Sequence, residues 1–121
     1  MYQVSVRRHF DAAHFLRNYR GKCERLHGHR FEVIVTLEAE ELDEAGMAYD
    51  FSGLKKLLDV ILERFDHSSL NEMQPFDKVN PSSENIAATI YREFSPGLEG
   101  EASIHSIQVY ESPNAWATYV P

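Results

Sequence analysis

The sequence has a single cysteine and no long apolar run among its 121 residues. One cysteine cannot form a disulfide within the chain, which excludes a small secreted scaffold held by disulfides. No segment reaches the roughly 20 apolar residues that span a bilayer, and the first residues carry no apolar signal core. We therefore expect a soluble, cytoplasmic protein with no membrane partner.

Basic residues are scarce as well. The chain has 12 Lys and Arg against 19 Asp and Glu, a net charge of -7. This balance makes a nucleic acid an unsuitable partner. The length predicts one domain over residues 1–121. The basic residues concentrate in the first quarter of the chain, where they are candidate contacts for a small anionic ligand: Arg7, Arg8, Arg17, Arg20, Lys22 and Arg25.

Hydrophobic periodicity predicts the order strand, strand, helix, helix, strand, strand. Apolar residues alternate with polar ones over 2–14, 27–38, 107–111 and 115–120. The period becomes helical over 51–65 and 83–94, with Asp50 or Ser52, and Ser82 or Ser83, as candidate N-caps. This order predicts an α+β fold, with two helices on one face of a four-stranded antiparallel sheet. Its two exposed edges favour oligomerisation through the sheet.

Three histidines have the pattern of a metal site. His27 and His29 are two residues apart on a predicted strand and therefore point to the same side, and His14 shares the inward parity of its own strand. Gly28 between them is expected to allow close backbone approach. Three imidazoles hold Zn²⁺ with a fourth position open for a substrate, whereas Cys23 as a fourth ligand would make a closed, structural site.

Three further groups are candidates for proton transfer or binding. Cys23 lies among basic residues near the presumed cation, which favours a thiolate acting as base or nucleophile over an inert buried thiol. Asp66 and His67 form either a proton-transfer pair or an exposed helix end. Glu111 has inward parity in an apolar strand, so it either binds paired N–H donors, meets an arginine, or lies at an exposed strand end.

Together these residues resemble the family of 6-pyruvoyltetrahydropterin and 6-carboxytetrahydropterin synthases, over nearly the whole chain. The short spacing from Cys23 to His27 is similar to that of the bacterial 6-carboxytetrahydropterin synthases. The resemblance implies the tunnelling fold, in which the sheets of several subunits join into a barrel and trimers stack in pairs as a homo-hexamer. The segments that carry it are Phe10-Asp11-Ala12-Ala13-His14, Cys23-Glu24-Arg25-Leu26-His27-Gly28-His29, Asp50-Phe51, Asp66-His67-Ser68-Ser69-Leu70-Asn71, Asn80-Pro81-Ser82-Ser83-Glu84-Asn85 and Val109-Tyr110-Glu111.

The resemblance also implies an activity. The substrate would be 7,8-dihydroneopterin triphosphate, and the products 6-carboxytetrahydropterin, acetaldehyde and triphosphate, for the synthesis of 7-deazaguanines and queuosine. The basic first quarter would contact the triphosphate. The implied roles are zinc binding by His14, His27 and His29, proton acceptance by Cys23, completion of its triad by Asp66 and His67 from a neighbouring subunit, and pterin anchoring by Glu111.

Alternatives remain open at this point. In a related subfamily a glutamate before the His-Gly-His segment replaces the cysteine, and the product is 6-hydroxymethyl-7,8-dihydropterin for folate synthesis. Here Cys23 and Glu24 are adjacent, which resembles members with both activities. The alternative is that Glu24 is a solvent-facing loop residue without a catalytic role. The 6-pyruvoyltetrahydropterin synthase activity is a further alternative. The non-enzymatic one is a pterin-binding module with a structural zinc.

Overall fold

The structure, a computed structural model, describes residues 1–21 and 24–121. Two helices and five strands follow one another in this part of the chain, with short 3₁₀ turns at Leu70–Glu72 and Ser95–Gly97. The bounds are β1 Tyr2–His14, β2 His27–Ala39, α1 Phe51–Phe65, β3 Ser68–Ser69, α2 Ser83–Phe94, β4 Ser103–Ser112 and β5 Ala115–Tyr119.

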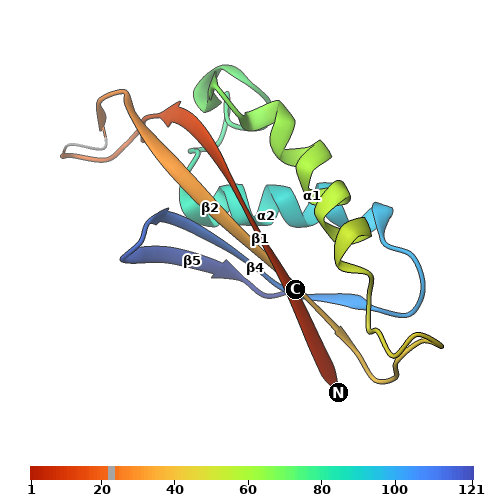
Figure 1. The fold of residues 1–121 in the computed structure, drawn as a ribbon. Helices are drawn as coiled ribbons and strands as arrows, with labels where there is room; N and C mark the ends of the chain where they lie inside the picture. The colour runs from red at the N-terminus through yellow and green to blue at the C-terminus, as the bar shows by residue number, and fades with distance from the viewer. Residues whose placement is uncertain (22–23) are drawn as a thin grey trace.

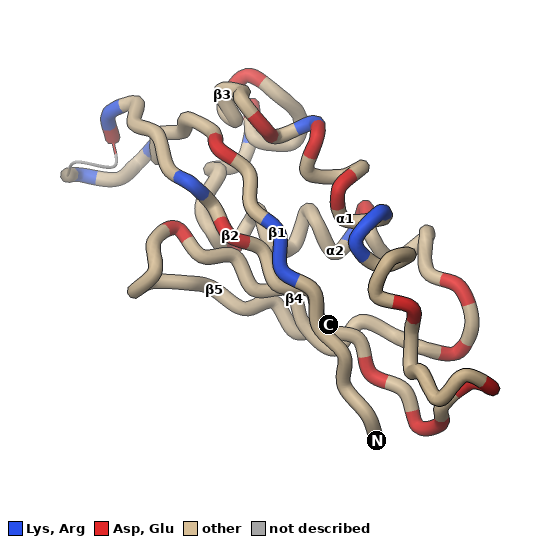
Figure 2. Tube along the Cα trace, in the orientation of Figure 1, with Lys and Arg blue, Asp and Glu red and all other residues tan. Residues whose placement is uncertain are grey.

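The strands form one sheet in the order β3-β1-β2-β4-β5 (Figures 1 and 2). β1 and β2 pair antiparallel over their whole lengths, from Tyr2 opposite Ala39 to His14 opposite His27. β4 adds antiparallel to β2, and β5 adds antiparallel to β4. The predicted four antiparallel strands are therefore present. The prediction missed β3, which pairs parallel to β1, because two residues are too few to show a period.

Side-chain caps determine where the helices begin. The Asp50 side chain accepts a hydrogen bond from the Ser52 backbone N–H, so Asp50 is the N-cap of α1. The Ser82 side chain accepts from the Asn85 N–H at the start of α2. The structure thus decides both pairs of candidate caps, and it ends α1 at Phe65, directly before the Asp66-His67 pair.

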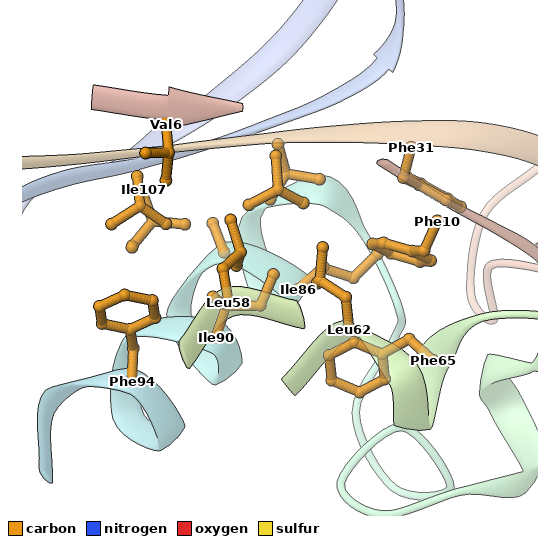
Figure 3. Close-up of a cluster of buried hydrophobic side chains, with 14 of the residues drawn as sticks. Val6, Phe10, Phe31, Leu58, Leu62, Phe65, Ile86, Ile90, Phe94 and Ile107 are labelled. Carbon is orange, nitrogen blue, oxygen red and sulfur yellow. The ribbon is translucent and has the colours of Figure 1, made fainter. Parts of the chain in front are cut away.

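Both helices lie on one face of the sheet and enclose the core with it (Figures 1 and 3). Apolar side chains of β1, β2 and β4 with strand alternation meet those of α1 and α2 with helical spacing, as the sequence predicts. Phe10 and Phe31 stack at 5.0 Å between ring centroids, at the end of the core nearest His14 and His27. The core side chains labelled in Figure 3 are Val6, Phe10, Phe31, Leu58, Leu62, Phe65, Ile86, Ile90, Phe94 and Ile107.

Charge is unevenly distributed along the fold. Figure 2 shows acidic positions gathered in the loops that follow β2 and precede β4, at the end of the sheet opposite the β1–β2 connection. Basic positions lie on β1, on β2, in the connection between them and on α1. Among residues 1–21 and 24–121, no helix is long and apolar enough to cross a membrane.

Candidate functional site

The three predicted histidines meet where the β1–β2 hairpin begins to separate. His14 ends β1 and is the register partner of His27, which begins β2, while His29 pairs with Ala12. Strand alternation directs all three toward the helix side, next to Phe31. The side chain of His14 is 1% exposed, so the cluster extends from the core to the surface.

The imidazole rings lie edge to face around a common centre. Their centroids are 4.6 Å apart for His14 and His27, 4.7 Å for His27 and His29, and 5.4 Å for His14 and His29. One nitrogen from each ring and one carboxylate oxygen of Glu111 lie within 4.8 Å of one another. Three imidazole nitrogens and a carboxylate oxygen gathered in this way form a group that could hold a metal ion.

Backbone carbonyls fix the tautomers of two of these rings. His14 Nδ1 is 2.7 Å from the Pro81 carbonyl oxygen, and His27 Nδ1 is 2.6 Å from that of Arg25. A carbonyl oxygen only accepts, so both Nδ1 atoms carry hydrogen and both Nε2 atoms present lone pairs. This is the arrangement in which metal-binding histidines are usually held.

The environment of His14 fits a cation. Its Nε2 is buried and makes no hydrogen bond within the described part of the chain, although a Glu111 oxygen lies 3.3 Å away in poor geometry. A buried polar atom without a partner is costly unless another group binds it. Burial also lowers the pKa of His14, which keeps the ring neutral and its lone pair available. The residues present therefore fit a zinc ion.

Glu111 lies closer to the histidines than sequence reasoning indicated. One of its oxygens is 3.3 Å from His14 Nε2 and 3.2 Å from His29 Nε2, and its side chain is 31% exposed. The inward parity of Glu111 was visible in the sequence. The register that brings it there, with Tyr110 opposite Glu32, was not. In the described residues its carboxylate thus meets histidines rather than an arginine.

Asp66 and His67 form a second, separate group. His67 Nδ1 lies 2.9 Å from an Asp66 oxygen, and the other Asp66 oxygen accepts from the Asp11 backbone N–H at 2.9 Å. The hydrogen bond from the Asp11 N–H is the main cause that lowers the pKa of Asp66, and the contact with His67 lowers it further. His67 has a φ of 56°, and its own N–H donates to the Asp11 carbonyl. The pair therefore lies beside β1, and one chain does not place it in the histidine cluster.

The family model for 6-pyruvoyl tetrahydropterin synthase matches residues 3–121. The chain belongs to this family.

Members of the 6-pyruvoyl tetrahydropterin synthase family match the chain over nearly its full length. A Bacillus subtilis protein named 6-carboxy-5,6,7,8-tetrahydropterin synthase is 33% identical over 99% of this chain and 86% of its own. A Synechocystis protein of the same name is 38% identical over 91% and 86%. A Pyrococcus furiosus protein named dihydroneopterin monophosphate aldolase is 33% identical over 90% and 89%.

A solved structure agrees with this assignment. The 6-pyruvoyl tetrahydropterin synthase of Caenorhabditis elegans superposes with a TM-score of 0.84 at 28% identity, covering 100% of this chain and 97% of that one. The predicted α+β tunnelling fold is therefore confirmed, with β3 as an addition to the expected sheet.

The remaining residues singled out from the sequence fall between the end of β1 and the first residues of β2 along the chain. Cys23 and Lys22 fall outside the residues that the structure describes. Glu24 is exposed, and its backbone N–H donates to the Gly21 carbonyl. A Cβ added at Gly28 would be 3.9 Å from the Ala12 oxygen, an ordinary contact, so the expectation that Gly28 serves close backbone approach within one chain is wrong.

The basic residues of the first quarter differ in what already binds them. The guanidinium of Arg8 pairs with Asp59 at 2.9 Å, and that of Arg17 donates to the Phe76 carbonyl at 2.9 Å. Arg7 makes a longer contact of 3.7 Å with Glu32, and Arg20 and Arg25 are exposed loop residues. Arg20 and Arg25 are therefore better placed than Arg8 and Arg17 to contact an anionic ligand.

Proposed function

We propose that this protein is a zinc-dependent 6-carboxy-5,6,7,8-tetrahydropterin synthase. It would convert 7,8-dihydroneopterin triphosphate to 6-carboxytetrahydropterin, acetaldehyde and triphosphate in the cytoplasm, for 7-deazaguanine and queuosine synthesis. The observation that carries the proposal is the cluster of His14, His27 and His29, in which the buried His14 Nε2 makes no hydrogen bond to any residue that the structure describes. Full-length similarity to proteins named for this activity supports the choice of substrate.

The histidine cluster would hold the zinc ion and leave a coordination position for the substrate. When bound, zinc supplies Lewis acidity to the hydroxyl groups of the pterin side chain. Glu111, beside His29, would anchor the pterin, because a carboxylate accepts from two parallel N–H donors and orients the ring. Arg20 and Arg25 are the candidate contacts for the triphosphate.

Proton transfer is assigned to residues on either side of the cluster. Cys23 would accept a proton from the substrate side chain as a thiolate, and His67 would return one. Asp66 faces Nδ1 of His67, so Nε2 is the atom that exchanges the proton. Because this pair is exposed and apart from the histidines in one chain, we assign it to the site of a neighbouring copy, within a homo-hexamer.

Product analysis tests the assignment directly. Purified, zinc-loaded protein is incubated with 7,8-dihydroneopterin triphosphate, and the products are identified by mass spectrometry. We expect 6-carboxytetrahydropterin together with acetaldehyde. A 6-pyruvoyl product would indicate triphosphate elimination without side-chain cleavage, and no turnover by the zinc-loaded protein would contradict the proposal.

A second candidate activity is formation of 6-hydroxymethyl-7,8-dihydropterin, alone or beside the first. The observations that favour it are the exposed Glu24, one residue after Cys23, and the relative named dihydroneopterin monophosphate aldolase. A glutamate base and a thiolate base would abstract different protons. If the hydroxymethyl product dominates and Glu24→Gln abolishes it, the acid-base role belongs to Glu24.

The non-enzymatic alternative is separated by metal removal. The protein should stay folded when a chelator removes a catalytic zinc, whereas removal of a structural CysHis₃ zinc should unfold it. We expect the circular dichroism of the chelated protein to be retained while activity is lost. Unfolding on chelation would favour a pterin-binding module with a structural zinc.

A further inference from the structure

A closed ring of bonds holds the imidazole of His14. Its Nδ1–H donates to the Pro81 carbonyl at 2.7 Å. The residue before Pro81 is hydrogen-bonded to the segment 15–17 that follows β1, which we call the strand extension. Asn80 accepts from the Arg17 backbone N–H and donates to the Arg17 carbonyl, both at 2.8 Å. Arg17 lies three residues after His14, so the ring closes through the intervening backbone.

The direction of these bonds is fixed by chemistry. The Arg17 N–H can only donate and its C=O can only accept, so Oδ1 of Asn80 faces the first and Nδ2 the second. The side-chain amide of Asn80 thus pairs with both backbone groups of Arg17, as the backbone of a neighbouring strand would. Pro81 has no N–H of its own, so the segment depends on its neighbours for anchoring.

The other end of this segment is bound to α2. Asn85 Nδ2 donates to the Asn80 carbonyl at 2.8 Å, and the Ile86 N–H donates to the Ser82 carbonyl at 2.9 Å. The Pro81 carbonyl is therefore held between a helix start and the strand extension. Its position, and with it the ring orientation of His14, is set from both sides.

We propose that Asn80 is a positioning residue for the metal ligand His14, acting through the Pro81 carbonyl. Asn80 fixes that carbonyl where it selects the Nδ1–H tautomer and aims Nε2 at the centre of the histidine cluster. Without the Asn80 side chain the carbonyl is held from the α2 side alone, and His14 can adopt other ring orientations. This inference rests on the proposed zinc role of His14.

Asn71 offers a matched control on the same strand extension. It makes the same two-bond bridge, accepting from the Phe15 N–H at 2.9 Å and donating to the Phe15 carbonyl at 3.0 Å. Asn71 is buried and Asn80 half-buried, and Asn71 does not precede the Pro81 carbonyl. Losing either bridge disorders the strand extension, whereas only the loss of the Asn80 bridge releases the carbonyl that holds His14.

The test measures Zn²⁺ affinity by competition with a chromogenic chelator in the wild type, Asn80→Ala and Asn71→Ala. Thermal unfolding of the metal-free proteins is the stability reference. We expect Asn80→Ala to weaken Zn²⁺ binding about 10-fold, the lower end of what loss of a group supporting a ligand costs. It should also alter the visible spectrum of bound Co²⁺. Asn71→Ala should lower the melting temperature with near-wild-type affinity and spectrum.

Each other outcome overturns the inference in a distinct way. Equal loss of Zn²⁺ affinity in Asn80→Ala and Asn71→Ala would show that general disordering of the strand extension, and not release of the Pro81 carbonyl, weakens binding. Unchanged affinity in Asn80→Ala would remove Asn80 from the metal site. A wild type that binds no Zn²⁺ would refute the proposed function, and the inference with it.

A conservative variant guards against failure to fold. Asn80→Asp keeps the acceptor for the Arg17 N–H and loses the donor to its carbonyl. If Asn80→Ala is unfolded, Asn80→Asp should still weaken binding, by less than 10-fold. Wild-type affinity and Co²⁺ spectrum in Asn80→Asp would then contradict the proposal.

Discussion

Two groups of reactive side chains lie on or beside strand β1 and differ most in exposure. The side chain of His14 is 1% exposed, and that of His67 is 80% exposed. Both groups bring their candidate ligand atoms within 4.8 Å inside one chain, the second together with Asp11, but the histidine cluster reaches into the core whereas Asp66 and His67 are largely exposed. The first group is thus partly enclosed by its own chain, and the second is open to groups from outside the chain.

Strand alternation separates the two groups. Ala12 and His29 are register partners that face the helices, and the next pair, Asp11 and Arg30, faces the opposite side. Arg30 donates to both Asp11 oxygens, at 3.0 and 3.2 Å, and the backbone of Asp11 holds Asp66 and His67 beside the strand. Under the proposed function, metal binding would be a property of one chain, and proton transfer a property of the assembly.

The largest effect is expected at the buried group. His29→Ala removes one of three ligands without emptying the core, because His29 is only partly buried. We expect the loss of stoichiometric zinc by elemental analysis and of all detectable turnover, with a folded protein by circular dichroism. A His29→Ala protein with full zinc content would place the metal elsewhere.

The second prediction distinguishes Cys23 as a proton acceptor from Cys23 as a zinc ligand. Cys23→Ala should keep one zinc per chain and most of the stability, yet lose about 10²- to 10⁴-fold in carboxytetrahydropterin formation, the usual contribution of a proton-transfer group. Zinc content and kcat are measured on the same preparation. Loss of zinc in this variant would instead make Cys23 the fourth ligand of a closed site.

The third prediction tests whether the exposed group serves another copy. His29→Ala and His67→Ala should each be inactive alone, but mixing them after mild denaturation and refolding should restore activity. With random assembly, roughly a quarter of the sites would combine an intact cluster with an intact pair. Refolded single variants are the control. No recovery from mixed oligomers would mean that both groups must come from one chain.

Sequence reasoning went far where the pattern is local. The inward parity of His14, the spacing of His27 and His29, and the apolar stripes of both helices are all properties of short segments, and the structure has them as expected. The tunnelling fold followed from motif resemblance rather than from periodicity.

What sequence reasoning missed depends on register and on single hydrogen bonds. Glu111 reaches the histidines through the register in which β4 pairs with β2. β3 pairs with β1 directly after the His67 N–H bonds to the Asp11 carbonyl. The Asn80 bridge joins residues 63 apart in the sequence, and no local pattern encodes such a contact.

The smallest expected effect concerns acid stability of the exposed group. The Asp11 N–H lowers the pKa of Asp66, and the hydrogen bond from Arg30 lowers that of Asp11, both from 3.8. A lowered pKa in the folded state favours the ionised form. The resulting stability is present above pH 3.8 and is lost as the pH falls through the lowered value. Denaturation midpoints of Asp66→Asn and Asp11→Asn should therefore approach that of the wild type as the pH falls below 3.8.

Salt distinguishes the two carboxylates in that experiment. Half-molar salt screens the exposed Arg30–Asp11 ion pair but leaves the Asp11 N–H bonded to Asp66. The acid dependence contributed by Asp11 should shrink in salt, and that contributed by Asp66 should persist. If both vanish, the Asp66 carboxylate is held by long-range charge rather than by the backbone. The backbone would then not fix the orientation of the Asp66-His67 pair, which its proposed role in the site of a neighbouring copy requires.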